Sequence, residues 1–428
     1  MSKLIILLAI LGIMNIIRLT MYMIASDYYE IYRTLKTRKN KNKRAYVPTI
    51  SVVVPAHNEG VIIRDTLESL QASIYRKDKM EIILVDDGSS DNTATIARNY
   101  ISKLRRSGED YFPTRVIRQK NGGKASALNN GIRNYATGKL VMCLDGDSLV
   151  DPNMVKNSVA YFRDRYVMAM ASNVNIIEDG TVLSLVQRFE YILCGHMKKA
   201  QTAMNVEYII GGIGSVFRRS TIRWVKFYDT NTMTEDIDLS MKIVGRGNKR
   251  NKLIFASDAI SYTEPVHSLK ALIGQRFRWK YGRMQTFLKN RAIFFNTGKE
   301  YSKLLTWIML PFTLVQEFFL FCEPLVIGFL LYTSIRYQNP RTMIFVASII
   351  SIYLLLAVWS TEHLSKTEKI RLSVLAPTMY FLVYMLTLVE YLSLVMSVSK
   401  LPKLKASIAN EFTTWKSPER SGITAQKP

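Results

Sequence analysis

The sequence predicts an α/β fold with a mainly parallel sheet, placed between apolar segments that are long enough to cross a membrane. Between about residues 49 and 260, short buried strands alternate with amphipathic helices. Aspartates directly follow two of these strands, as Asp86-Asp87 and as Asp145. Apolar runs occupy residues 4 to 25 and much of the chain beyond residue 300. These observations together indicate a water-facing domain flanked by membrane segments.

The first apolar segment predicts a transmembrane helix over residues 1–26, which Asn15 and Arg18 interrupt. A cleaved signal peptide is the competing interpretation, but it would carry its positive charge before the apolar run. Here a Lys- and Arg-rich stretch at residues 33–44 follows the run instead. Because such stretches stay on the cytoplasmic side, residues 27–48 are expected to form a basic cytoplasmic linker.

Residues 49–265 are expected to form the α/β domain. The predicted elements, in order, are a strand at 50–54, a helix near 60–72, a strand at 81–85, a helix at 91–104 that Asp91 caps, a strand at 114–118, a helix at 124–135 and a strand at 140–144. Strands joined by crossover helices form a parallel sheet, and ligands bind at the carboxyl ends of such strands. Both aspartate motifs fall at these ends, so a functional site is expected there.

The remainder of the chain is expected to return to the membrane. Residues 266–303 predict interfacial helices, and residues 304–399 predict about three spans, near 304–334, 343–360 and 372–398, before a basic tail at 400–428. The first of these runs is too long for one straight crossing, so it is either an interfacial helix followed by a span or two broken segments. Three spans would put the tail outside, whereas its Lys and Arg residues favour the inside. The number of spans therefore stays open.

Composition excludes several classes of function. The net charge is +24, but it is concentrated near the predicted membrane edges, and no zinc finger, RNP motif or basic heptad array indicates nucleic-acid binding. Cys143, Cys194 and Cys322 are widely spaced and form no CxxC pair. They predict small buried residues rather than disulfides or a metal site, which suits a reducing compartment.

Asp145-Gly146-Asp147 is the candidate metal site. Two aspartates around a turn glycine present carboxylates to one side, and hard oxygen ligands suit Mg²⁺ or Mn²⁺. Alone the pattern is weak, because a chain of this length contains about one Asp-x-Asp by chance. Its place after an apolar strand is what favours a functional role.

Two further motifs suit a nucleotide. Asp86-Asp87-Gly88-Ser89 follows a strand, where an aspartate accepts hydrogen bonds from a uracil or a ribose; alternatively, it caps the following helix. Asn121-Gly122-Gly123-Lys124 precedes a helix and combines a flexible backbone, a helix N-terminus and an ammonium group, which suits a phosphate. A surface turn explains this second motif equally well.

Thr234-Glu235-Asp236 is the candidate catalytic segment. A hydroxyl nucleophile needs a base, and Asp236 is the candidate for it. Alternatively, the segment is an acidic helix N-terminus that the helix dipole favours, and Asp238 fits that interpretation.

Gln275, Arg278 and Trp279 share one helix face at positions i, i+3 and i+4. The Arg fork suits a diphosphate and the Trp plane suits a sugar ring. A packed amphipathic helix at the membrane surface is the alternative, and it accounts for Arg276, Lys280 and Arg283.

The glycines Gly211, Gly212 and Gly214 leave backbone uncovered, so a substrate could approach closely there. A simple turn between strands is the alternative, and the spacing is not that of a dinucleotide-binding loop.

The ordered aspartate motifs, closed by Gln275-Arg276-Phe277-Arg278-Trp279, resemble those of inverting family 2 glycosyltransferases, in particular the membrane-integrated processive branch of hyaluronan, cellulose, chitin and poly-N-acetylglucosamine synthases. The motifs cover about residues 48 to 290, and hydropathy alone carries the resemblance beyond them. Thr234-Glu235-Asp236-Ile237-Asp238 is more similar to the poly-N-acetylglucosamine and cellulose synthases than to the animal-type hyaluronan synthases.

The resemblance implies a Rossmann-like GT-A domain in the cytoplasm and a multi-pass protein of the plasma membrane. It implies a UDP-sugar donor, a growing glycan as acceptor, Mg²⁺ or Mn²⁺ as cofactor, and membrane lipids as partners. Some relatives use a partner subunit, so an accessory membrane subunit is a candidate partner as well. No nucleic-acid partner is expected.

The resemblance also implies a role for each motif. Asp86 and Asp87 would contact the uridine, and Lys124 the base or the diphosphate. Asp147 would be the main metal ligand, with Asp145 at the donor and the metal. Asp236, beside Glu235, would deprotonate the acceptor hydroxyl. The remaining residues divide into Gln275 and Arg278 at the diphosphate, Trp279 under the acceptor sugar, and Gly211, Gly212 and Gly214 near the acceptor end.

The expected function is processive β-transfer from a UDP-sugar, with UDP-N-acetylglucosamine favoured, and extrusion of the polymer across the membrane. Glu317, Glu323 and Glu390 lie in apolar segments and are candidate channel-lining groups; an interfacial location is the alternative, above all for Glu317. A single-transfer enzyme that makes a glycolipid or a lipid-linked glycan is the second hypothesis. A non-enzymatic membrane channel or anchor with a degenerate transferase domain is the third, and the intact aspartates argue against it.

Overall fold

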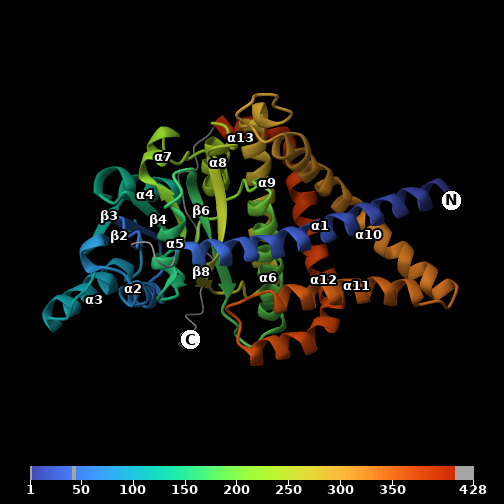
Figure 1. Ribbon diagram of the computed structural model, residues 1–428, viewed down its shortest axis with the longest axis horizontal. Coiled ribbons are helices and arrows are strands. Elements are labelled where there is room, and N and C mark those ends of the chain that lie inside the picture. Colours follow the sequence, from blue (N-terminus) through green and yellow to red (C-terminus); the bar gives the residue numbers. More distant parts are fainter. Residues whose placement is uncertain (1, 41–44, 410–428) are drawn as a thin grey trace.

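The computed structural model describes residues 2–40 and 45–409, as drawn in Figure 1. Only the backbone is described at residues 2–16, 37, 40, 318, 330, 342, 346, 380, 381, 383 and 409. A sheet with helices on both faces forms one end of the molecule, and long helices project from the other end (Figure 1). Most of the basic tail expected at 400–428 lies outside the described residues.

The central feature is an eight-stranded sheet with the order β3-β2-β1-β4-β7-β6-β8-β5. Its strands are β1 (Ile50–Ala56), β2 (Met80–Asp87), β3 (Thr114–Gln119), β4 (Leu140–Cys143), β5 (Ser148–Val150), β6 (Val167–Ile176), β7 (Ser215–Arg218) and β8 (Lys252–Thr263). All four strands predicted between residues 50 and 144 are present, and they occupy one half of the sheet.

The sheet is mixed rather than mainly parallel, which corrects the prediction. β3, β2, β1 and β4 pair in parallel, as do β6 and β8, but β7 runs antiparallel to both β4 and β6, and β5 runs antiparallel to β8. The parallel half follows from the crossover helices that join its strands. β7 is instead entered from the irregular segment 205–214, and this connection imposes no parallel pairing.

The parallel strands are buried on both faces, which explains their unbroken apolar sequences. Val53, Ile83 and Val141 pack into one core, and Val52 and Ile82 pack into a second core on the opposite face. Successive side chains of a strand point to opposite faces, so a strand covered on both sides has no polar alternation. This double covering is why the strands could be recognised from hydrophobic runs.

The three helices predicted individually in the α/β domain are present close to their predicted positions, as α2 (Ile63–Gln71), α3 (Thr93–Ser107) and α4 (Lys124–Asn130, continued by a π-turn over Gly131–Tyr135). The structure adds α5 (Met154–Tyr161), α6 (Val182–Ala203), α7 (Arg219–Trp224) and α8 (Glu235–Val244), and it has α9 (Leu269–Lys289) in the region expected to form interfacial helices. The N-cap of α3 is Asn92 rather than the predicted Asp91, but Asp91 still contacts the start of the helix, because its Oδ1 accepts a hydrogen bond from Thr93 N at 3.0 Å.

The first helix, α1 (Ser2–Asn40), lies against α6 and reaches the sheet (Figure 1). The buried Tyr29 donates a hydrogen bond from its hydroxyl to the carbonyl oxygen of Phe255 on β8, at 2.8 Å. Glu30 pairs with Lys199 of α6 at 2.7 Å. The span expected at 1–26 falls largely on positions whose side chains lie outside the described residues, and the helix continues into the region expected as a linker.

Long helices cover the apolar segments predicted beyond residue 300. They are α10 (Leu310–Arg336, after a π-turn at Leu304–Met309), α11 (Arg341–Trp359) and α12 (Lys366–Ser399), followed by the short α13 (Leu404–Ala409). Within the part of the chain that the structure describes, one helical segment, Phe319–Arg336, is long and apolar enough to cross a membrane. A second candidate is the bent pair Lys366–Met379 and Tyr384–Ser399 of α12. The number of spans therefore stays a prediction.

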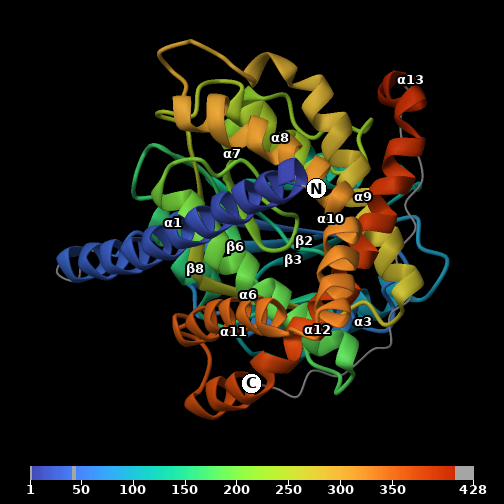
Figure 2. The same ribbon diagram turned by 90° about the vertical axis from the view of Figure 1, so that its right-hand side faces the viewer.

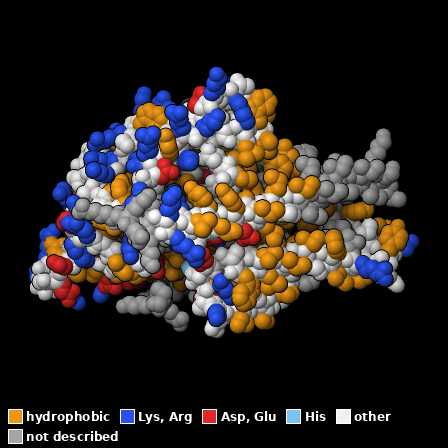
Figure 3. Space-filling view, in the orientation of Figure 1, with side chains coloured by type: hydrophobic (Ala, Val, Ile, Leu, Met, Phe, Trp, Pro, Cys, Tyr) orange, Lys and Arg blue, Asp and Glu red, His pale blue; other side chains and the backbone are white. Residues whose placement is uncertain are grey.

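The two halves of α12 meet at an angle of 65°. Pro377 lies inside the helix just before the break. A proline in a helix removes one backbone hydrogen bond and its ring crowds the carbonyl four residues earlier, which weakens the turn before Pro377, whereas the break itself lies between residues 379 and 384. Figure 3 shows hydrophobic side chains gathered on the half of the molecule that holds α10, α11 and α12, with Lys and Arg more frequent on the other half.

Candidate active site

The predicted site lies where the parallel strands end. Ala56 at the end of β1 is in register with Asp86 at the end of β2, and Asp87 is in register with Gln119 at the end of β3. The carboxyl ends of parallel strands meet at one edge of a sheet, so the polar residues after these strands come together. This edge is where the aspartate motifs were expected.

Asp87 organises the glycine loop before α4. Its side chain is fully buried, Oδ1 accepts from Gln119 Nε2 at 2.8 Å and from Gly122 N at 3.0 Å, and Oδ2 accepts from Gly123 N at 2.9 Å. Gly88 has a φ of +70°, and a Cβ at that position would lie 2.7 Å from Asn121 N. The two motifs that were predicted separately are therefore one unit.

Asp86 fixes the turn that follows β2. Its Oδ1 accepts a hydrogen bond from Ser89 N at 3.2 Å, and its Oδ2 lies 3.2 Å from Arg118 Nε. Arg118 also donates to the carbonyl oxygen of Ser89 at 2.9 Å. Both carboxylates of the motif hold protein backbone in place, and their contact with a uridine stays a prediction.

His57 and Asn58 also belong to this edge, and sequence reasoning missed them. His57 Nδ1 lies 2.9 Å from the carbonyl oxygen of Asp87, and the Asn58 side chain accepts from Ser90 N at 2.8 Å. Asn58 has a φ of +56°, which is uncommon for a residue other than glycine. The available signal was their position directly after the predicted strand at 50–54, the same signal that identified Asp86 and Asp87.

The centre of the site is a cluster of one cation and three carboxylates. Lys124 Nζ lies 2.6 Å from Asp145 Oδ1 and 3.5 Å from Glu235 Oε1. Asp236 follows Glu235 at the start of α8. The ammonium is held at the start of α4, the carboxylates at the end of β4 and the start of α8, so three separate predicted motifs converge.

The cluster shifts the acid–base behaviour of its members. Burial, and next the charge of Glu235, raise the pKa of Asp236 to about 6, although Lys124 opposes the shift. Burial disfavours the charged form of Lys124, but Asp145, Glu235 and Asp236 together outweigh it and raise the pKa of Lys124. A carboxylate that titrates near neutral pH is suited to accept a proton.

Of the three glycines predicted near the acceptor, Gly212 adjoins the cluster. A Cβ on Gly212 would lie 2.8 Å from Lys124 Nζ and 3.7 Å from Asp145 Oδ1. Gly214 has a φ of +62°, and a Cβ there would lie 2.5 Å from Met154 Cε, so its role is in the backbone. A Cβ on Gly211 would meet no atom within 4 Å.

The carboxylate oxygens of Asp145 and Asp147 supply part of the ligand set that a divalent cation needs. No group of three or more His, Cys, Asp or Glu side chains is placed to hold a metal ion among the described residues. The nearly buried Asp147 accepts a hydrogen bond from Ser148 Oγ at 3.0 Å. One or two carboxylates completed by substrate phosphates are the usual way in which proteins bind Mg²⁺, and these two aspartates match that pattern.

Helix α9 packs directly against Met233 and Thr234, the two residues before α8. A Cβ on Gly282 would lie 2.6 Å from Thr234 Oγ1, and Gln285 accepts a hydrogen bond from Met233 N at 3.0 Å. This contact brings the helix that carries Gln275, Arg278 and Trp279 next to Glu235 and Asp236. Gln275 and Trp279 are half-buried and Arg278 is exposed. Neither the side chain of Gln275 nor that of Arg278 makes a hydrogen bond or ion pair within the described part of the chain.

Arg276 and Lys280, which also lie on α9, are buried inside the protein rather than exposed on a polar helix face. Their exposed fractions are 4% and 5%, and they pair with carboxylates of three other helices. The partners are Glu190 of α6, Glu317 of α10 and Glu390 of α12; Glu317 also pairs with Arg283. Two of the predicted channel-lining carboxylates are therefore engaged with α9.

Two further residues, Asp238 and Tyr191, do not belong to the cluster. Asp238 is fully buried and bonds to Lys289 at 2.8 Å, so it belongs to the packing of α8 on α9 rather than to the cluster. Tyr191 of α6 was missed by the sequence. Burial raises the pKa of Tyr191 to about 12, and the charges of Arg276, Glu190 and Asp145 all act on it. Tyr191 follows Glu190 on α6, and Glu190 pairs with Arg276 of α9.

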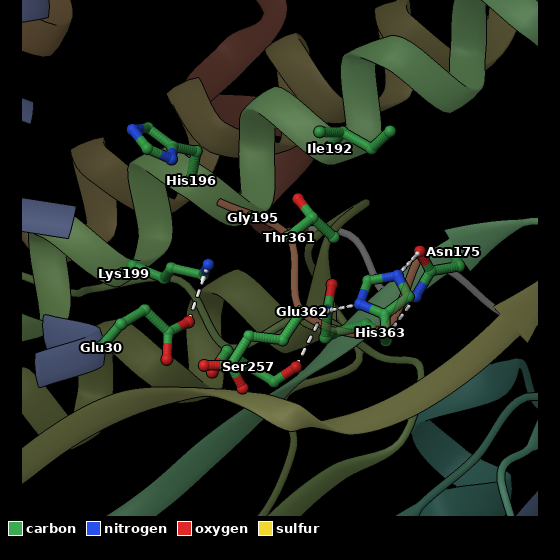
Figure 4. Close-up of a pocket in the computed structure, with 11 residues that line it drawn as sticks. Glu30, Asn175, Ile192, Gly195, His196, Lys199, Ser257, Thr361, Glu362 and His363 are labelled. Atoms are coloured by element: carbon green, nitrogen blue, oxygen red, sulfur yellow. Dashed lines mark hydrogen bonds and ion pairs between the residues drawn. The ribbon is translucent and has the colours of Figure 1, made fainter. Parts of the chain in front are cut away.

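A cavity lies elsewhere, between α1, α6, the sheet and the segment 360–363 (Figure 4). Lys199 points toward Glu30 across it, and His363 lies beside Asn175, with His363 Nε2 2.8 Å from Asn175 Oδ1. None of the predicted site residues lines this cavity. We therefore place the active site at the strand ends and not here.

Of the three cysteines, Cys143 is buried as predicted, whereas Cys194 and Cys322 are half-buried; all three are free. Burial raises the pKa of the Cys143 thiol to about 12, so it is an unreactive packing residue.

Comparison with known families gives two overlapping matches. Residues 51–224 match a family described as Glycosyl transferase family 2, and residues 140–393, more than half of the chain, match Glycosyl transferase family group 2. Together they span the strand-end motifs, α9 and most of the C-terminal helices.

Two curated relatives and one solved structure are also similar to the chain. A protein named poly-beta-1,6-N-acetyl-D-glucosamine synthase, from Staphylococcus aureus (strain COL), is 32% identical over 283 residues, which are 65% of each chain. A protein of the same name from Staphylococcus epidermidis is 26% identical over 396 residues, 90% of each chain. A mannosyltransferase from Pyrobaculum calidifontis, solved with GDP-Man and Mn²⁺, has a TM-score of 0.53 at 18% identity and covers 90% of this chain and 96% of that chain. This last similarity shows a GT-A-like fold.

Proposed function

The chain belongs to glycosyltransferase family group 2, and from this premise we propose that it polymerises N-acetylglucosamine from UDP-N-acetylglucosamine into a β-linked glycan. The cluster of Lys124, Asp145, Glu235 and Asp236 is the observation that carries the proposal. It combines an ammonium group that can contact a phosphate with a carboxylate that can act as a base. The names of the staphylococcal relatives favour N-acetylglucosamine and a β-1,6 linkage.

The donor would lie along the edge formed by the ends of β1, β2 and β4. Asp86 and Asp87 would face the uridine, with the Asp87 carboxylate holding the loop of Gly122 and Gly123 beneath it. Their hydrogen bonds hold the turn and the loop in place before a nucleotide arrives, which lowers the cost of binding.

Asp147 and Asp145 would hold a Mn²⁺ or Mg²⁺ ion. When bound, the ion supplies positive charge against the diphosphate that leaves. Lys124, 2.6 Å from Asp145 in this structure, would supply a second positive charge to the same diphosphate. Gln275 and Arg278 of α9 would contact it from the other side, since neither is bonded within the described residues.

Asp236 would accept the proton of the acceptor hydroxyl. The acceptor oxygen forms a bond to the anomeric carbon of the donor while the bond from that carbon to the diphosphate breaks, so UDP leaves with the electron pair. Attack opposite the leaving group converts an α-linked donor into a β-linked product. The raised pKa of Asp236 suits this role, because a base is most effective when its pKa is near the working pH.

The acceptor glycan would enter past Trp279 and the glycine segment. The indole plane suits the C–H face of a sugar. Gly212 leaves the backbone beside Lys124 uncovered, so an acceptor hydroxyl has room next to the cluster.

The chain would act from the cytoplasmic side of the plasma membrane and pass its product through the bilayer. The support is the apolar segment Phe319–Arg336, the bent helix α12 and the basic stretch after residue 33. An accessory membrane subunit would be a further partner, together with membrane lipids.

The test is radiolabel transfer by the purified protein in lipid nanodiscs. UDP-N-acetylglucosamine, UDP-glucose and UDP-glucuronate are offered alone and in pairs with Mn²⁺ or Mg²⁺, and the product is sized by gel and digested with linkage-specific glycosidases. We expect a high-mass product from UDP-N-acetylglucosamine alone. A product that needs two donors would contradict a homopolymer, and a single sugar on an extractable lipid would contradict processive transfer.

A further inference from the structure

We propose that Arg276 is a positioning residue for the acceptor platform, because it holds the Trp279 ring in place while Glu190 and Glu390 hold Arg276. The inference rests on the proposed function in one respect, namely that Trp279 contacts the acceptor glycan. It adds that the orientation of this ring is set by carboxylates of two other helices, α6 and α12.

Arg276 contacts the Trp279 ring and two carboxylates. Its Cζ lies 4.2 Å from the centre of the Trp279 ring, which places the guanidinium over the indole. Its Nη2 donates to Glu190 Oε2 at 2.6 Å, and its Nε lies 3.3 Å from Glu390 Oε1. The side chain is 4% exposed, so these contacts are shielded from water.

A guanidinium is better suited to this task than an ammonium. It is planar, so one side chain stacks on an aromatic face while its edge bonds to carboxylates. A cation is attracted to the face of an indole, and the attraction is stronger when the pair is shielded from water. Arg276 is buried, so its contact with Trp279 is of the shielded kind.

One of the two carboxylates that hold Arg276, that of Glu390, is itself held by a second cation. Glu390 Oε2 lies 2.8 Å from Lys280 Nζ, which in turn lies 2.9 Å from Glu317. Ser393 donates from its hydroxyl to the carbonyl oxygen of Ile273, one turn before Arg276. Helices α9 and α12 lie side by side in Figures 1 and 2. The network therefore fixes the rotation of α9 against α6, α10 and α12.

The same network reaches the reaction centre. Tyr191 neighbours Glu190 on α6, and the charges of both Arg276 and Asp145 act on its hydroxyl. Gly282 packs on Thr234, directly before Glu235 and Asp236. A rotation of α9 would therefore move the Trp279 ring relative to the proposed base.

The first test separates acceptor binding from donor binding. Arg276→Lys keeps the charge and loses the planar stack. Arg283→Lys is its matched control, because Arg283 lies on the same helix as Arg276 and pairs with Glu317 of α10 without contacting Trp279. With a short oligosaccharide acceptor, Arg276→Lys should raise the acceptor KM about tenfold and leave the donor KM and kcat within about twofold. Arg283→Lys should leave the acceptor KM unchanged.

A double-mutant cycle excludes a merely structural effect. If Arg276 acts through the indole, Arg276→Lys should have no further effect on the acceptor KM in a Trp279→Ala background. Equal effects of Arg276→Lys in the two backgrounds, or an unchanged acceptor KM in the single variant, would overturn the proposal.

A readout without substrate keeps this inference distinct from the proposed function. The fluorescence of Trp279 is obtained by subtracting the spectrum of the matching Trp279→Phe protein, in the nanodisc. Arg276→Lys and Glu390→Gln should shift this difference spectrum and Arg283→Lys should not; an unchanged spectrum in both of the first two variants would refute the positioning role. If the spectrum shifts while the wild-type protein makes no polymer, the proposed function fails and the positioning geometry stands.

Discussion

The ammonium of Lys124 lies 2.6 Å from a carboxylate oxygen of Asp145, although the two residues come from motifs at the ends of different elements. Glu235 lies 3.5 Å from the same ammonium. In the described part of the chain, Lys124 is the cation that contacts this acidic cluster. It balances three carboxylates that would otherwise repel one another.

We expect Lys124→Met to reduce glycosyl transfer about 100-fold or more, because it removes positive charge from the position of the leaving diphosphate. It should also raise the pKa of Asp236, since Lys124 lowers that pKa in the intact cluster. The measurement is the pH–rate profile of transfer. Lys120→Met, an exposed lysine of the same loop, is the control and should retain the wild-type profile.

The pH dependence of transfer should have an acid limb near pH 6. A base must be deprotonated, and the pKa of Asp236 is raised to about 6 by burial and by Glu235, so activity should fall as the pH falls through this value. Asp236→Asn should lower kcat by a factor of about 10²–10⁴. Asp238→Asn, two residues away and bonded to Lys289, should keep the acid limb; its loss in that variant would show that the limb belongs elsewhere.

Gly212→Ala should impair transfer, whereas Gly211→Ala should be silent. The added Cβ at position 212 would lie 2.8 Å from Lys124 Nζ, so the flexible end of the lysine must move away from its position. A displacement of about 1 Å in an active site costs up to about 100-fold in rate. At position 211 the Cβ meets nothing within 4 Å. Equal activity of the two variants would contradict the placement of Gly212 beside the cluster.

Removal of the divalent metal should abolish transfer, and Asp147→Ala should prevent its restoration. Asp147 is nearly buried at the end of the turn after β4, where a carboxylate facing the donor supplies a hard ligand. Activity is measured after chelation and during a Mn²⁺ titration. The control is Asp151→Ala, four residues further along the chain, which should regain full activity at the wild-type Mn²⁺ concentration.

The parallel half of the sheet was predictable because its strands are covered on both faces. Val52, Val53 and Val54 are all fully buried, so the strand reads as an unbroken apolar run, and the polar residues that follow it mark its end. The strands β5 (Ser148–Val150) and β7 (Ser215–Arg218) are short and contain polar residues, so neither forms an apolar run, whereas the equally short β4 is apolar throughout. Their antiparallel pairing depends on connections whose course no local pattern specifies.

The candidate site was predictable as a set of motifs but not as a network. Asp87 follows a strand, which indicated a ligand, but its partners Gly122 and Gly123 are 35 and 36 residues away. Arg276 and Lys280 have the sequence pattern of solvent-exposed charges on an amphipathic helix. Their burial depends on Glu190, 86 residues before Arg276, and on Glu317, 37 residues after Lys280. Only the packing of four helices makes these pairs.

The attachment of α1 to β8 has a practical consequence for anyone who wishes to isolate the catalytic half. A polypeptide that begins after residue 44 would lack Tyr29 and Glu30, and would leave the Phe255 carbonyl and the Lys199 ammonium without these partners. It would also uncover the surface of α6 that α1 covers. Such a fragment should precipitate in the absence of detergent, and a preparation that keeps the N-terminal helix is the one in which the enzyme is expected to remain intact.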